Sequence, residues 1–251
     1  SEEPSGGSSQ GGSLPGVSDD QDAATPPFQW TDAARALVRD HFGAKDHRVL
    51  AREVGCTVDE LRVEARRLYA DVTPDRTGPW AAEELTSLKR YLGVVEVDLI
   101  ARMIGRTEAS IQQKLVELAA ELTPEALETR FHVEFKRLYG TRADEDLALI
   151  FGRQLGVIQA LAAELCLSKD KGFMRRKAGT GAPRTKMPRW SAAELDQLRE
   201  IYPQQSNLEI AKALGRSVKS IVSKAHSLRL KKDKARLRQM GQENVQLRQD
   251  R

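Results

Sequence analysis

The sequence predicts an all-α protein built from tandem three-helix units. An apolar residue is followed 21 positions later by Ala, 25 later by Gly and 31 later by Leu or Ile, four times and without gaps. Between these positions apolar residues recur at steps of three and four, and helix-start and helix-stop signals fall at matching places. The four sets are Trp30, Ala51, Gly55 and Leu61; Trp80, Ala101, Gly105 and Ile111; Leu127, Ala148, Gly152 and Ile158; and Trp190, Ala211, Gly215 and Ile221.

Such a repeat divides the chain into small domains, each about the size of one three-helix module. We call the segments 28–72, 78–122, 123–168 and 189–232 units 1 to 4. Gly and Pro are concentrated near the start of the chain and ahead of unit 4, so we expect a disordered tail over 1–27 and a basic linker over 169–188. The remaining segment, 233–251, is predicted to form a basic C-terminal helix.

Unit 4 carries the helix signals most completely. Its first two helices each open on a capping-box pattern, in which a serine hydroxyl caps a backbone N–H and a glutamate three residues later reaches back. Pro203 stops the first helix, and Gly215 suits the left-handed conformation that ends the second. A third helix then buries Ile221, Ala225 and Leu228. The capping residues are Ser191 with Glu194, Ser206 with Glu209, and Ser217 for the third helix.

This order and spacing of helices is typical of a helix-turn-helix. With Trp190, Glu194 and the segment IAKALGRSVKSIVSKAHSLRL that begins at Ile210, unit 4 resembles the Myb/SANT group of homeodomain-like helix-turn-helix domains, in the versions seen in bacterial and phage proteins. The resemblance covers unit 4 strongly, most of units 1 and 2, and unit 3 weakly. Of the three regularly spaced tryptophans of the Myb pattern only the first is kept, and unit 3 has Leu127 there. The resemblance implies that the third helix binds double-stranded DNA.

The distribution of charge indicates which part of the chain would meet DNA. The formal net charge is +4, but residues 1–167 hold 19 Lys and Arg against 28 Asp and Glu, whereas residues 168–251 hold 21 against 8. The front part is therefore acidic, with a net charge of −9, and the rear part is basic, at +13. Because phosphates attract cations, we expect the nucleic-acid contact to be confined to the basic part.

The candidate contact residues follow from the helical period of 100° per residue. If Ile221 marks the buried side of the third helix, small serines and Lys219 lie on the outer side, where they could reach phosphates or base edges. Basic residues at the ends of that helix are placed for phosphates. The linker could enter a minor groove as homeodomain arms do, or serve as a plain spacer. The predicted DNA contacts are Ser217, Lys219, Ser220, Ser223, Lys224, His226 and Ser227 in the helix; Arg216, Arg229, Lys231 and Lys232 at its ends; and Arg184, Lys186 and Arg189 in the linker.

The same outward positions in units 1 to 3 do not suit DNA, because they are largely acidic or apolar. Only Arg66 and Arg67 leave a phosphate contact open for unit 1. An apolar outer face in units 2 and 3 must be covered. Either the units pack on one another into one N-terminal body, or they bind a protein partner. The positions are Asp59, Glu60, Val63, Arg66 and Arg67; Ala109, Ser110, Gln113, Val116 and Glu117; and Gly156, Val157, Ala160, Ala163 and Glu164.

The C-terminal segment has the spacing of a short coiled-coil seam. Leu237, Met240, Asn244 and Leu247 alternate in steps of three and four, and the Asn could set the register. Two heptads that contain Gly241 make a marginal coil. The segment 237–247 therefore predicts either a homodimer contact or a basic helical extension along the DNA backbone.

Other chemistry is not indicated. Cys56 and Cys166 have no CxxC partner, the four histidines are not at ligand spacing, and no phosphate-binding glycine loop or GxSxG motif occurs. We expect no catalytic residues, no metal and no cofactor. Apolar runs are too short for a membrane span, so we expect an intracellular protein, in the bacterial cytoplasm or nucleoid or in a eukaryotic nucleus.

The sequence thus favours sequence- or structure-directed binding of double-stranded DNA, for transcription regulation or chromosome organisation. Two alternatives stay open. The chain could be a protein-interaction scaffold with secondary DNA contact, or an accessory subunit that targets a recombination, transposition or phage-packaging machine to DNA.

Overall fold

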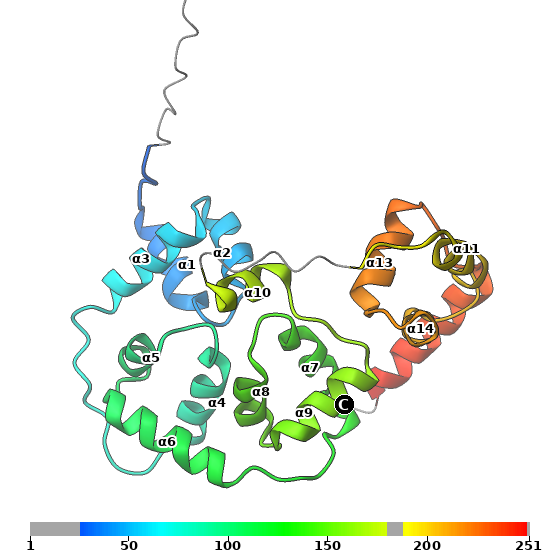
Figure 1. Cartoon of the computed structure of the whole chain (residues 1–251). Helices are drawn as coiled ribbons and strands as arrows, with labels where there is room; N and C mark the ends of the chain where they lie inside the picture. The colour runs from blue at the N-terminus through cyan, green and yellow to red at the C-terminus, as the bar shows by residue number, and fades with distance from the viewer. Residues whose placement is uncertain (1–25, 180–187, 250–251) are drawn as a thin grey trace, which may run out of the picture.

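The computed structural model describes residues 26–179 and 188–249, and every regular element in these ranges is helical (Figure 1). The prediction of an all-α fold is confirmed. The one bridge of strand type in the described residues is isolated and joins Thr123 to Arg153. Nearly all of the expected N-terminal tail, together with Arg184 and Lys186 of the linker, lies outside the described residues.

Each of the four units contains three α-helices. In unit 1 these are α1 (Asp32–His41), α2 (His47–Val54) and α3 (Val58–Leu68), and in unit 2 α4 (Ala82–Tyr91), α5 (Val97–Ile104) and α6 (Glu108–Ala120). Unit 3 has η1 (Thr129–Phe131), α7 (His132–Tyr139), α8 (Asp144–Phe151) and α9 (Leu155–Glu164). Unit 4 has α11 (Ala192–Ile201), α12 (Asn207–Leu214) and α13 (Val218–Ser227), with α10 (Lys171–Ala178) before it and α14 (Lys234–Gln249) after it.

The repeat has one structural explanation in all four units. Its glycine ends the second helix in the left-handed conformation, with φ between 59° and 89°, which costs a glycine little. The residue after the glycine donates its backbone N–H to the carbonyl of the repeated alanine, at 2.9–3.1 Å. The repeated Leu or Ile is fully buried in the third helix. The 21, 25 and 31 spacing therefore records one corner between the second and third helices, used four times.

The first three units pack against their neighbours at one recurring place, the turn after the first helix. A Cβ on Gly43 would lie 2.5 Å from the Tyr91 ring of unit 2, and one on Gly93 would lie 2.8 Å from the Arg142 side chain of unit 3. Gly140, at the same repeat position, meets Asp170 ahead of α10 in the same way. Units 1 and 2 also share one apolar core. Units 1 to 3 therefore form one body, which is one of the two arrangements the sequence left open.

This packing does not cover the outer faces of the third helices. Val116 of α6 is 70% exposed, and Ala109 and Gln113 beside it are exposed as well. On α9, Leu155 and Ala160 are exposed. The units meet through these turns and through contacts of α8 with α4 and α6, which leave these residues of α6 and α9 uncovered, so covering of the faces by a partner stays a prediction.

The linker prediction needs correction, because part of segment 169–188 is helix α10. Its basic last turn, which includes Arg176, complements the helix dipole. The helix is held at its start, where Asp170 donates its backbone N–H to the Gly140 carbonyl and Lys169 pairs with Asp144 at 2.7 Å. In Figure 1 α10 lies beside α2, and a Cβ on its Gly172 would meet the Arg48 side chain of that helix. The composition of this segment did not predict a helix, because the contacts that hold the helix come from units 1 and 3.

The predicted C-terminal helix is present as α14. Leu237 and Asn244 of the proposed seam are exposed, and the side chain of Leu247 is outside the described residues. Arg236 is buried and pairs with Glu243 at 3.0 Å. A homodimer through 237–247 stays a prediction. No helix within the described ranges is both long and apolar enough to cross a membrane.

Candidate nucleic-acid interface

A buried arginine holds the start of unit 2 in place, and unit 4 contains the same arrangement. Arg106 follows the repeat glycine, and its guanidinium lies 4.5 Å from the Trp80 ring centroid. Nε donates to Glu84 at 2.8 Å, and Nη2 donates to the carbonyl of Pro79, the residue just before Trp80, at 2.9 Å. Only 4% of the Arg106 side chain and 5% of the Glu84 side chain are exposed. This clamp holds the start of the unit against the corner between α5 and α6.

Unit 4 repeats the clamp, and this corrects the role predicted for Arg216. Its guanidinium lies 4.2 Å from the Trp190 centroid, donates to Glu194 at 2.8 Å and donates to the Arg189 carbonyl at 3.0 Å. The side chain is only 10% exposed. A group engaged in this way is not available to a phosphate, so we remove Arg216 from the contact residues.

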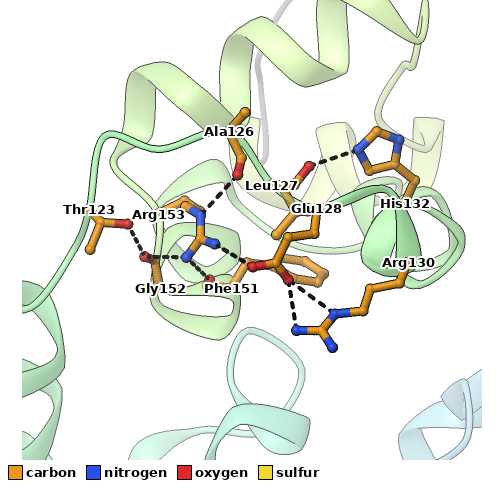
Figure 2. Close-up of polar contacts among 9 residues, drawn as sticks. All are labelled: Thr123, Ala126, Leu127, Glu128, Arg130, His132, Phe151, Gly152 and Arg153. Carbon is orange, nitrogen blue, oxygen red and sulfur yellow. Dashed lines mark hydrogen bonds and ion pairs between the residues drawn. The ribbon is translucent and has the colours of Figure 1, made fainter. Parts of the chain in front are cut away.

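Unit 3 uses a reduced version of the clamp, which Figure 2 shows. Arg153 points toward the residues on either side of Leu127, where Nε lies 3.5 Å from the Ala126 carbonyl oxygen and Nη2 lies 3.4 Å from Glu128. Unit 1 has Cys56 at this position and no clamp. The sequence carries the signal, an arginine 26 residues after the first repeat position in units 2 to 4. This arginine was not predicted to hold the unit together.

The clamp predicts a pH dependence of stability. The Arg106 guanidinium lowers the pKa of Glu84 from 4.5 to about 2. A carboxyl whose pKa is lower in the folded than in the unfolded protein stabilises the fold above its unfolded pKa, and this contribution is lost as the pH falls toward the folded pKa. We expect the free energy of unfolding to drop between pH 4.5 and pH 2, and the drop to be smaller in Glu84→Gln. Urea unfolding of both proteins measures the difference. If the free energy of unfolding falls equally with pH in both proteins, the ion pair between Arg106 and Glu84 does not contribute to stability.

The outer face of α13 is arranged as predicted. Ile221 and Ala225 are fully buried against α11 and α12, so the opposite face carries Ser223, His226 and Ser227, all exposed. Ser220 and Lys224 are half-buried on the flanks. Ser217 caps the helix by accepting from the Ser220 backbone N–H. The exposed Val222, which the sequence analysis did not name, adds an apolar group to this surface.

The first turn of α13 is close to unit 3. Lys219 is exposed but forms an ion pair with Asp170, and the Val218 backbone N–H donates to the Cys166 carbonyl at 2.9 Å. Leu208 of α12 also packs on the apolar core of unit 3. Lys219 can therefore meet a phosphate only if it leaves Asp170.

The basic residues at the ends of unit 4 divide into two groups. Lys232 donates to the Gln205 carbonyl and lies 3.7 Å from the Tyr202 ring centroid, and burial lowers the pKa of its ammonium to about 8. The prediction that Lys232 contacts phosphate is corrected, because this ammonium already has a partner and is partly neutral near pH 8. Arg189, Arg229 and Lys231 are exposed and stay candidates.

The arginines of unit 1 are occupied by contacts within the protein. Arg66 pairs with Asp98 of α5 at 2.7 Å and so links units 1 and 2. Arg67 pairs with the buried Glu64. A phosphate contact by unit 1 at these positions would break both pairs, which favours α13 over α3.

Neither a protein-family model, a curated protein nor a solved structure matches this chain. The functional argument therefore rests on the arrangement of the residues. Within residues 26–179 and 188–249 no group of three or more His, Cys, Asp or Glu side chains is placed to hold a metal ion.

Proposed function

We propose that this chain binds double-stranded DNA by placing α13 against a groove, in transcription regulation or chromosome organisation inside the cell. The observation that carries the proposal is the chemistry of the outer face of α13. Ser223, His226 and Ser227 are exposed there with no carboxylate among them, whereas the same face of α6 carries Glu117 and Val116. Small hydroxyls allow close approach to DNA, and a carboxylate opposes phosphate.

Charge around this face supports the proposal. Residues 168–251 have a net charge of +13, and Arg189, Arg229 and Lys231 extend from the two ends of unit 4 into solvent. Such cations release counterions from DNA, so binding should weaken steeply with salt. The resemblance of unit 4 to Myb/SANT domains points to the same helix.

The proposal is tested by a charge-matched pair of variants of the whole chain. Ser223→Glu with His226→Glu places two carboxylates on α13, and Gln113→Glu with Val116→Glu places two at the equivalent positions of α6. We expect the α13 variant to bind a duplex at least about tenfold more weakly than the wild type, because each carboxylate repels phosphate. The α6 variant should stay within about twofold. Fluorescence anisotropy over a salt series measures both.

Equal loss in the two variants would mean that only total charge matters and would reject the assignment to α13. Unchanged binding by the α13 variant, with helicity retained in circular dichroism, would reject it as well.

A second candidate function is protein interaction through units 2 and 3. It is favoured by the uncovered faces of α6 and α9, where Val116 and Leu155 are exposed. In this case the body recruits a partner while unit 4 holds DNA, as in an accessory subunit of a recombination, transposition or packaging machine. Loss of a co-purified partner in Val116→Glu, with DNA binding retained, would support this function.

A further inference from the structure

A cavity of about 830 Å³ lies where units 1, 2 and 3 meet α10. Its walls come from the α1–α2 and α4–α5 turns, from α7 and the turn after it, and from α10. A Cβ on Gly172 of α10 would overlap the Arg48 guanidinium and would lie 3.5 Å from Nη1 of Arg176. Two guanidinium groups from different elements therefore lie close together at this wall.

The cavity concentrates positive charge in an acidic part of the molecule. Nine lysines and arginines line it, and seven of them belong to residues 1–167, where carboxylates outnumber cations 28 to 19. Lys45, Arg62 and Arg137 are paired with carboxylates, whereas the other six form no ion pair with any described residue: Arg48, Lys89, Arg90, Arg142, Arg176 and Lys177.

Three carboxylates lie at the cavity, and each already has a partner within the protein. Asp46 caps α2 by accepting the backbone N–H groups of Arg48 and Val49. Glu134 pairs with Arg137, and Asp170 pairs with Lys219. The positive charge in the cavity is therefore only partly compensated by the protein.

Two buried side chains at the cavity have polar atoms without partners in the described part of the chain. Arg142 is 7% exposed, and its Nε makes no hydrogen bond, although its Nη1 donates to Thr141 at 2.9 Å. His47 is 8% exposed and stacks on Phe42, and its Nε2 has no partner. Buried polar groups are nearly always hydrogen-bonded, so unpaired ones at a cavity point to a ligand or to water.

The electrostatics agree with this geometry. Burial and the nearby Arg62 lower the pKa of His47 to about 4. Burial and then Arg137 lower the pKa of Arg142, although Asp146 acts in the opposite direction. Burial and the repulsion between neighbouring arginines disfavour the charged forms of Arg142 and His47. A bound anion would reduce this electrostatic cost.

We propose that this cavity binds a small anion with two or more linked phosphate groups, of the nucleoside polyphosphate or inorganic polyphosphate class. Guanidinium groups match phosphate oxygens with paired N–H donors, and several of them around one space favour several phosphates over one. The volume is in the range of small-ligand sites, about 300–1,000 Å³. The cavity does not include the outer face of α13, and the ion pair between Asp170 and Lys219 links the two sites.

The test uses the full chain and sodium tripolyphosphate in isothermal titration calorimetry, with orthophosphate and ATP as comparison ligands. We expect one tripolyphosphate per chain, a rise in melting temperature, and binding of orthophosphate at least about tenfold weaker. Arg48→Glu with Arg176→Glu should weaken tripolyphosphate binding by about tenfold or more. Arg142→Gln removes one buried cation without reversing charge and should weaken binding as well.

The matched control is Arg52→Glu with Arg175→Glu, which makes the same charge change on α2 and α10 outside the cavity. Both residues are exposed, and we expect affinity within about twofold of the wild type. Absence of tripolyphosphate binding, or equal loss in the control, would overturn the proposal. If tripolyphosphate does not bind while the Arg48 and Arg176 variant selectively loses duplex affinity, the cavity belongs to a DNA surface and the small-anion proposal is wrong.

Discussion

Replacement of Arg106 by alanine is expected to destabilise unit 2 by about 3–5 kcal/mol, the usual cost of removing one partner from a buried ion pair. The substitution leaves Glu84 buried without its counter-ion and removes the cation stacked on Trp80. It also leaves the Gly78 and Pro79 carbonyls without their donor. Urea unfolding followed by tryptophan fluorescence and circular dichroism measures the effect.

Arg102→Ala is the control for this substitution, because Arg102 is an exposed arginine on α5 in the same unit. Its cost should be within about 0.5 kcal/mol, as for most surface positions. Arg216→Ala should destabilise unit 4 less than Arg106→Ala destabilises unit 2, because more of the Arg216 and Glu194 side chains is exposed. If Arg106→Ala costs no more than Arg102→Ala, the clamp does not hold the unit together.

Replacement of Gly43 by alanine should cost about 2–6 kcal/mol. Gly43 has a φ of 78°, and strain of this kind costs an L-residue about 1–3 kcal/mol. The new Cβ would also lie 2.5 Å from the Tyr91 ring, and overpacking adds about 1–3 kcal/mol. Thermal unfolding of the variant reports the sum.

Gly78→Ala separates the two costs. Gly78 has a φ of 76°, but nothing lies within 4 Å of where its Cβ would be, so only the backbone strain should appear. A Gly43→Ala cost equal to that of Gly78→Ala would mean that the junction between units 1 and 2 yields without loss. The excess for Gly43 therefore measures how tightly the N-terminal body is packed.

Local signals were enough to predict the three helices of unit 4 and the residues that cap them. Ser191 and Ser206 form the capping boxes expected of them, and Gly215 ends α12 in the left-handed conformation. These features depend on residues a few positions apart, where sequence spacing fixes the geometry. Burial of Ile221 likewise set which side of α13 faces outward.

Features that depend on contacts between distant segments were not predicted. Arg216 appeared free for phosphate because its partners, Glu194 and the Arg189 carbonyl, lie more than twenty residues away in the sequence. Helix α10 looked like linker because its contacts lie in units 1 and 3. The cavity beside it collects cations from α10 and from three units that are acidic on average, so no composition window reveals it.

The central claim is that α13 meets DNA and α6 does not. A photo-crosslinking residue placed at position 223, and in a second protein at the equivalent position 113, tests this directly on the full chain with a labelled duplex. The account predicts a crosslink from position 223 that weakens as salt is raised, and none above background from position 113. A crosslink from position 113 alone, or equal crosslinks from both, would contradict it.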